Sequence, residues 1–217
     1  MPQAIKRYSC VTGRSATVDG EAFPVAAEAG DGDEGKFLAA LYRALKADYP
    51  KFFKMDALSK LGFLASELIL RDEAPRFVPR EDIAVVCFNR SASLATDVQH
   101  QAAIQREDSC YPSPSVFVYT LPNIVAGEIA IRNKLLGETS FYVCREWSAQ
   151  QVFRMVSHTF CDGCTRAVLA AWVECFEGTC EAFMMLVEQQ DGLSGLPFSV
   201  EQVDILYQNT KLKLWKS

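Results

Sequence analysis

The chain has 217 residues, a formal net charge of −5, 49% hydrophobic residues and 23% charged residues. This length suffices for one sizeable hydrophobic core, and we expect a single domain over residues 1–217. The acidic balance argues against nucleic-acid binding, which needs clustered Lys and Arg. No apolar signal segment follows the amino terminus, and the longest apolar run, 167–173, is too short to cross a bilayer. We therefore expect a cytoplasmic protein without membrane contact.

Strand and helix patterns alternate along the chain and end in a hairpin. The sequence predicts strands at 5–11, 82–88, 115–120, 140–144, 167–176 and 182–187, and helices at 36–47, 56–70, 93–105, 122–136, from 148 onward and at 197–207. Residues 20–35 are predicted to form a loop. This alternation indicates an α/β fold with three layers, α-β-α, around a mostly parallel mixed sheet.

Two helix ends carry specific signals. Gly137 follows the apolar helix pattern that begins at Pro122, and it suits a carboxyl-terminal cap. Ser148 precedes Gln151 by three residues, which is the spacing of a capping box, so the next helix is expected to begin at Ser148.

Three segments together resemble the β-ketoacyl synthase family. Residues 121–138 read Leu-Pro-Asn-Ile-Val-Ala-Gly-Glu-Ile-Ala-Ile-Arg-Asn-Lys-Leu-Leu-Gly-Glu, similar to the family segment that joins a helix to the strand before its nucleophile turn. Residues 54–61 resemble its Arg-Met-Asp stretch, and 8–13 resemble its opening strand, which ends at Thr-Gly. The resemblance spans residues 8–172 and implies the amino-terminal half of the thiolase-like fold only.

Ketosynthase chemistry needs an acyl-accepting Cys, two histidines and an oxyanion hole. In the family the two histidines come from the second half, which the resemblance does not cover. The sequence has only His100 and His158, both in predicted helices and neither in a matching motif. We therefore interpret them as ordinary surface or packing residues.

Two residues compete for the nucleophile position that the resemblance implies. A gapless count from Gly137 puts Glu146 where the family has Cys, whereas a two-residue deletion in the turn would bring Cys144 into register. Both precede the helix that is expected to begin at Ser148. Its free N–H groups would lower the pKa of a thiol and stabilise a carboxylate.

Eight cysteines are present: Cys10, Cys87, Cys110, Cys144, Cys161, Cys164, Cys175 and Cys180. Several lie within apolar runs, where a free Cys behaves as a small hydrophobic residue, and we expect reduced thiols. Cys161 and Cys164 form a CxxC that, with Cys175 and Cys180, has the ligand number of a zinc site. The latter two flank a turn instead of forming a second CxxC, so we expect no metal and no cofactor.

The resemblance implies a ketosynthase-like protein of fatty-acid or polyene/polyketide-type acyl assembly, non-catalytic alone and acting as a subunit or accessory partner. The expected partners are an acyl carrier protein or a full-length ketosynthase, in a homo- or heterodimer with the strand at 115–120 as the pairing edge. Two alternatives remain open. One is an acyltransferase that uses Cys144 with groups from a partner chain, and the other is an acyl- or lipid-binding protein.

Overall fold

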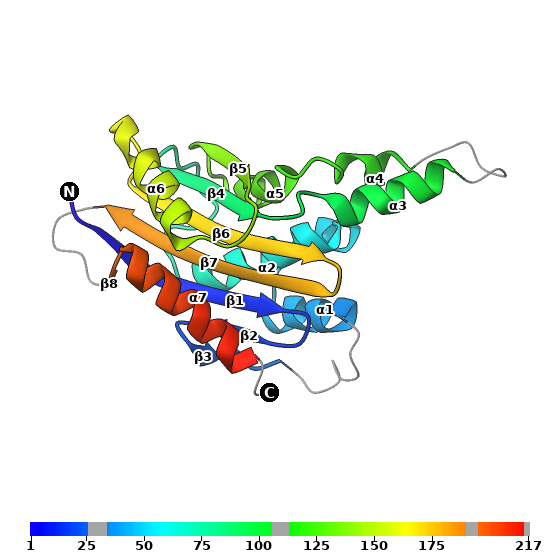
Figure 1. The fold of residues 1–217 in the computed structure, drawn as a ribbon, viewed down its shortest axis with the longest axis horizontal. Helices are drawn as coiled ribbons and strands as arrows, with labels where there is room; N and C mark the ends of the chain where they lie inside the picture. The colour runs from blue at the N-terminus through cyan, green and yellow to red at the C-terminus, as the bar shows by residue number, and fades with distance from the viewer. Residues whose placement is uncertain (26–33, 106–112, 190–194, 215–217) are drawn as a thin grey trace.

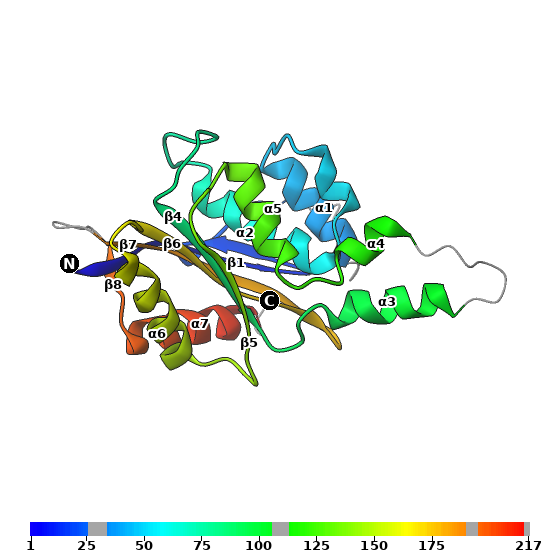
Figure 2. The same ribbon diagram turned by 90° about the horizontal axis from the view of Figure 1, so that it is seen from above.

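The computed structural model describes residues 1–25, 34–105, 113–189 and 195–214, which form three layers with helices on both faces of one mixed sheet (Figures 1 and 2). The strands are β1 (Gln3–Thr12), β2 (Ala16–Val18), β3 (Glu21–Ala22), β4 (Ile83–Asn89), β5 (Thr139–Val143), β6 (Ala167–Phe176), β7 (Thr179–Gln189) and β8 (Leu196–Pro197). The α-helices are α1 (Glu34–Ala44), α2 (Ala57–Leu70), α3 (Leu94–Ile104), α4 (Pro114–Val118), α5 (Ile124–Asn133), α6 (Ala149–Thr159) and α7 (Val200–Leu214). Two short 3-10 helices are η2 (Pro50–Lys54) and η3 (Phe160–Asp162). Within the described ranges, no helix combines the length and the apolar character that a membrane span requires.

The sheet has the strand order β3-β2-β1-β7-β6-β4-β5, and β8 also pairs with β1. Strand β4 is parallel to β5 and β6, whereas β7 is antiparallel to both β6 and β1. The strands β1, β4, β5 and β6 therefore run in one direction. The predicted hairpin is confirmed: Glu177 and Gly178 have φ values of 50° and 80°, the backbone conformation that a two-residue hairpin turn requires.

Two apolar clusters lie on opposite faces of the sheet. Helices α1, α2 and α5 cover one face, and α6 and α7 cover the other (Figure 2). Strand β4 serves both clusters, because Val85 and Cys87 face the first and Val86 and Phe88 face the second. This burial on both faces explains why the strand is a continuous apolar run.

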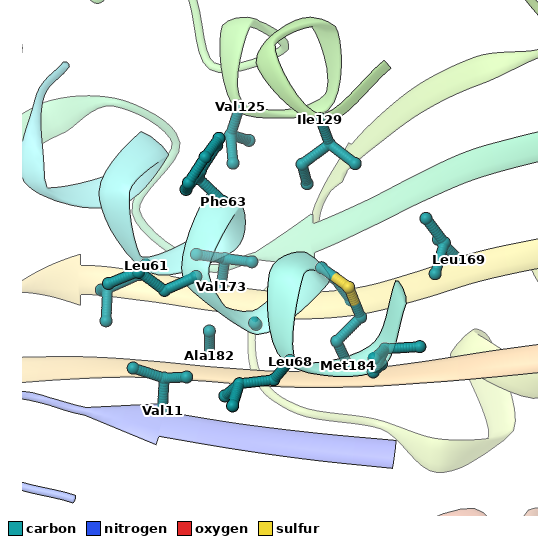
Figure 3. Close-up of a cluster of buried hydrophobic side chains, with 14 of the residues drawn as sticks. Val11, Leu61, Phe63, Leu68, Val125, Ile129, Leu169, Val173, Ala182 and Met184 are labelled. Carbon is teal, nitrogen blue, oxygen red and sulfur yellow. The ribbon is translucent and has the colours of Figure 1, made fainter. Parts of the chain in front are cut away.

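Helix α2 lies at the centre of the first cluster, between the sheet and α5 (Figure 3). Leu61 and Leu68 lie beside the strands, and Phe63 lies toward Val125 of α5 (Figure 3). Gly62 permits this close approach, since a Cβ atom there would lie 2.4 Å from Cγ2 of Val125. The helix begins as predicted, with the Asp56 side chain accepting a hydrogen bond from the Ser59 N–H.

Helices α3 and α4 project away from the three layers as an arm (Figures 1 and 2). The strand predicted at 115–120 is wrong, because these residues belong to α4 and the turn that follows it. Pro114 occupies the first helical turn, and the N–H groups of Val116 and Phe117 donate to the carbonyl of Ser113. The β-branched and aromatic side chains favour a strand only where a neighbouring strand is available.

The carboxyl end of α5 also differs from the prediction. The helix ends at Asn133, and Lys134, with φ of 55°, is the left-handed residue of the cap. Gly137 has a different role, since a Cβ atom there would lie 2.4 Å from the carbonyl oxygen of Ile83. It lets the chain pass close to the start of β4. The predicted start of the following helix is confirmed, with Ser148 as its N-cap.

Candidate functional site

The candidate site lies where the parallel strands β4 and β5 end. The carboxyl edge of such strands is the usual place for ligands in open α/β sheets. The backbone N–H of Cys144 donates to the carbonyl of Asn89 at 2.7 Å and so extends the pairing of the two strands by one residue. The link between β5 and α6 consists of residues 144–148, and it holds both Cys144 and Glu146.

The thiol of Cys144 is half-buried against the cluster beneath α6 and α7. Its nearest hydrogen-bond acceptor is the carbonyl of Tyr142, 4.0 Å from Sγ. Burial raises the pKa of the Cys144 thiol, which is opposite to the lowering expected from the neighbouring helix amino terminus. This environment favours the neutral thiol over the nucleophilic thiolate.

The carboxylate of Glu146 is exposed. In the parts of the chain that the structure describes, no side-chain hydrogen bond or ion pair holds Glu146. The amino terminus of α6 is capped instead by Ser148, whose Oγ accepts from the N–H of Gln151 at 3.3 Å. The link also lacks the strained backbone of a nucleophile elbow, because the left-handed non-glycine residues of the described ranges do not include Cys144 or Glu146.

The two imidazoles are far apart along the chain and belong to separate elements. The His100 ring lies in α3, 5.5 Å from the ring of Phe117 in α4. Its Nδ1 is buried and has no hydrogen-bond partner among the residues that the structure describes. His158 is exposed in the last turn of α6, roughly 14 Å along that helix from its first residue. Among the described residues, neither imidazole has a hydrogen bond or ring contact with Cys144.

A buried carboxylate that was not predicted from the sequence lies near the carboxyl end of β4. Glu174 of β6 accepts from the backbone N–H groups of Arg90 at 2.9 Å and Ser91 at 3.3 Å, and from the Ser91 hydroxyl. These donors follow β4 directly, beside the end of the strand that pairs with β5. Glu174 occupies them. The signal in the sequence is a single acidic residue within the apolar run of β6.

The turn after β4 is fixed further by Asn89. Its side chain accepts from the Ala92 N–H at 2.9 Å and donates to the Ala92 carbonyl at 2.8 Å. Ala92 has φ of 50°, a conformation that these two bonds hold in place. The chain thus shapes this turn with its own side chains, and the turn leads directly into α3.

The four cysteines of the zinc alternative separate into two pairs. Cys161 lies in η3 and Cys164 follows it, both exposed, and the Asp162 carboxylate accepts from the Cys164 N–H at 2.8 Å. Cys175 and Cys180 face each other across β6 and β7. Over the described ranges, no group of three or more potential ligands could hold a metal ion. Cys110 lies outside the described residues.

Two cavities lie at the other end of the parallel strands, away from Cys144. One has a volume of about 230 Å³ and an apolar floor that includes Leu70, Ile83 and Leu135. The second, of about 530 Å³, shares Lys6 and Arg80 with it. Neither of these two cavities, which are lined by described residues, includes Cys144 or Glu146.

The edge strand and the arm carry an exposed apolar surface. Strand β5 is the last in the sheet order, and Val143 at its end is 57% exposed. The arm begins at the same corner, because Val143 pairs with Asn89, the last residue of β4. Exposed large apolar residues of the arm are Leu94, Val98, Ile104, Phe117, Val118 and Leu121. We call this set, together with Val143 and the outer edge of β5, the apolar corner.

Comparison with solved structures shows the ketosynthase-like thiolase fold. A structure of the ishigamide ketosynthase/chain length factor matches with a TM-score of 0.64 and 17% identity over 91% of this chain and 64% of that chain. A ketosynthase in complex with its chain length factor from Xenorhabdus doucetiae matches with a TM-score of 0.56 and 15% identity, over 96% and 91%. A β-ketoacyl synthase from Burkholderia phymatum matches with a TM-score of 0.60 and 14% identity, over 88% and 59%.

The predicted thiolase-like fold is thus confirmed, and the chain spans less than two thirds of the first and third of these proteins. No protein-family model matches the sequence. No curated protein matches it either. The roles of Cys144 and Glu146 stay predictions.

Proposed function

We propose that this chain is a ketosynthase-like subunit, non-catalytic by itself, that pairs with a ketosynthase in polyketide- or fatty-acid-type acyl assembly on an acyl carrier protein. This proposal rests on the chemical environment of Cys144 at the carboxyl ends of β4 and β5. Cys144 is a half-buried thiol with a raised pKa, the nearby loop N–H groups bind Glu174, and neither histidine contacts the thiol. A neutral thiol without a contacting imidazole is not the nucleophile–base pair that acyl transfer needs, which supports a non-catalytic role.

The solved structures support the pairing. The complex from Xenorhabdus doucetiae joins a ketosynthase to a chain length factor, and the chain matched there is covered over 91% of its length. A chain of similar length to this one therefore takes part in that complex. A further match, with a TM-score of 0.58 and 10% identity, is a type II polyketide ketosynthase bound to its acyl-carrier protein. These two assemblies are the basis for proposing a ketosynthase partner and a carrier-protein pathway.

The apolar corner is the proposed docking surface for the ketosynthase. The N–H of Cys144 and the carbonyl of Glu138 both bond to β4. Since successive residues of a strand direct their backbone groups to opposite sides, the backbone groups of Phe141 and Val143 point away from β4. They are available to a strand of the partner, and the exposed apolar side chains of the arm begin beside them.

The test is co-expression of this chain with the ketosynthase encoded by the same genome, followed by size-exclusion chromatography with light scattering. We expect a one-to-one complex. The Val143→Pro variant, which removes an outward N–H without breaking a bond to β4, should lose the complex, whereas the matched Val143→Thr variant should keep it. Phe117→Glu, on the exposed side of the arm, should weaken the complex independently of any effect on β5.

The same samples also test the alternative that this chain is an acyltransferase that uses Cys144. An acyl thioester probe should modify the ketosynthase and leave Cys144 unmodified, both in the complex and with this chain alone. Acylation of Cys144 would show that the chain is an acyltransferase. A complex that survives both Val143→Pro and Phe117→Glu, with circular dichroism unchanged in each variant, would show that the partner docks elsewhere.

A further inference from the structure

The end of the β6–β7 hairpin brings two thiols together on one face of the sheet. Cys175 of β6 is directly opposite Cys180 of β7, and their Sγ atoms are 2.8 Å apart without a bond between them. Both side chains belong to the cluster beneath α1, α2 and α5. The candidate site does not use either thiol, so this pair needs an explanation of its own.

The position in the hairpin suits a cross-link. The two-residue turn at Glu177 and Gly178 makes Phe176 and Thr179 the pair nearest the turn, which is hydrogen-bonded in such hairpins. Cys175 and Cys180 are then a non-hydrogen-bonded pair, whose Cα atoms lie about 4.5 Å apart. A disulfide spans Cα separations of about 4.4 to 6.8 Å. The strands therefore need no rearrangement for the two sulfurs to bond.

The two thiols differ in their exposure to solvent. Cys175 is half-exposed, whereas Cys180 is 9% exposed and lies near Glu34 at the start of α1. The pKa of Cys180 is raised by its hydrogen bond with Cys175, in which the neutral Cys180 thiol is the donor, and by its own burial. A reagent from solution reaches Cys175 first, and Cys180 is placed to react with whatever Cys175 carries.

We propose that Cys175 and Cys180 are a reversible disulfide site that exchanges with low-molecular-weight disulfides such as oxidised glutathione. The Cys175 thiolate attacks one sulfur of the small disulfide, which breaks its S–S bond, releases one small thiolate and leaves a mixed disulfide on Cys175. Cys180 then loses its proton to solvent, attacks Sγ of Cys175 and releases the second small thiolate, and both released thiolates take up protons from solvent. Two protein thiols are oxidised, and one small disulfide is reduced to two thiols.

The cross-link would lie beside the root of the arm. Glu174, which precedes Cys175, holds the Arg90 and Ser91 N–H groups that lead into α3. The disulfide therefore ties β6 to β7 at the point where β6 holds the arm.

The test uses the full chain, equilibrated in glutathione buffers of increasing oxidised fraction and then trapped with N-ethylmaleimide. Cleavage after Glu174, Glu177 and Glu181 separates the two cysteines onto the peptides 175–177 and 178–181. Mass spectrometry detects these peptides joined only if the disulfide has formed. We expect the joined pair, and we expect a reducing buffer to separate it again.

The CxxC at Cys161 and Cys164 is the matched control within the same chain, because both of its thiols are exposed and no Sγ contact joins them in the structure. We expect the Cys175–Cys180 pair to have an equilibrium constant for oxidation at least about tenfold larger, since its geometry is already in place. Oxidation of the CxxC at a glutathione ratio that leaves Cys175 and Cys180 as free thiols would overturn the proposal.

Single variants test the order of reaction. Cys180→Ala should stop at a glutathione adduct on Cys175, and Cys175→Ala should leave Cys180 unmodified while the chain stays folded. A stable glutathione adduct on Cys175 of the unaltered chain would contradict the proposal, because Cys180 would have failed to displace it. A glutathione adduct on Cys180 in the Cys175→Ala variant would contradict the assigned order.

Discussion

Helices α2 and α3 show how differently the body and the arm of this protein are stabilised. Of the 14 residues of α2, 12 are buried, whereas of the 11 residues of α3 only Thr96 is buried. The sheet and α5 cover α2 from two sides, and α3 projects away from both (Figure 2). The apolar side chains of α3 therefore stay exposed, as the docking surface proposed above requires.

The root of the arm is held by polar contacts as well as by Tyr119, which is buried in the first apolar cluster. The Ser93 hydroxyl donates to the carbonyl of Thr120 at 2.5 Å, and the Tyr119 hydroxyl donates to Oε1 of Glu128 at 3.1 Å. Glu128 also pairs with Lys51 at 2.6 Å. Burial of Tyr119, followed by the neighbouring Glu128 charge, raises the pKa of its hydroxyl. The arm is therefore positioned by directional bonds at its base, and its exposed apolar length stays available.

The largest difference between the two regions should appear when an aromatic ring is removed. Phe63 of α2 is fully buried, so Phe63→Ala should lower the free energy of unfolding by about 3–5 kcal/mol. Phe117 of α4 is 56% exposed, and Phe117→Ala should change that free energy by less than about 0.5 kcal/mol. Urea unfolding of the two variants measures both values. Similar losses would show that the arm is part of the same core.

A smaller effect on stability should come from raising the pH, because the thiol of Cys87 in β4 is buried. Burial raises the pKa of Cys87 to about 12 from an ordinary value of 9.0, so the folded state holds its proton where the unfolded state has lost it. The contribution of this protonated thiol to the free energy of unfolding is fully present below about pH 9. It falls by about 1.4 kcal/mol for each pH unit above pH 9, until about pH 12.

Urea unfolding between pH 8 and 10.5 measures this loss. Cys87→Ala should make the fall with pH shallower, whereas Cys161→Ala, at an exposed thiol, should leave it unchanged. Because Cys10 is also buried and its pKa is also raised to about 12, a smaller fall should persist in Cys87→Ala. An identical pH dependence in the Cys87→Ala variant would refute the assignment.

The smallest effect concerns Asp56, which joins the two regions. One carboxylate oxygen caps α2 through the Ser59 N–H, and the other accepts from the Thr96 hydroxyl of α3, each at 2.9 Å. Asp56→Ala should cost about 1–2 kcal/mol, since it removes a cap and a hydrogen bond. Thr96→Val removes only the bond to the arm and should cost about 1 kcal/mol.

Hydrogen exchange distinguishes the two variants. Thr96→Val should increase amide exchange in α3 while α2 stays protected, and Asp56→Ala should increase it in the first turn of α2 as well. Increased exchange throughout α2 in the Thr96→Val variant would mean that the arm and the body unfold together.

Elements whose burial follows directly from their own pattern could be predicted from the sequence. Strand β4 is apolar at every position except its last and is buried on both faces, and α2 begins at the residue whose side chain caps it. The hairpin at Glu177 and Gly178 was also predicted, because its turn residues fix its geometry. The same patterns failed at 115–120, where strand-forming residues lie in an arm with no neighbouring strand.

The sequence by itself determined the layered α/β fold, the start of α6 at Ser148 and the separation of the two histidines, because these depend on local spacing. Only the tertiary structure decided that Glu174 binds the N–H groups after β4, that β5 is the exposed edge and that Cys175 faces Cys180. Such contacts join residues that are distant along the chain or depend on strand register. Pairing order and burial set them, and neither is encoded in the spacing of one segment.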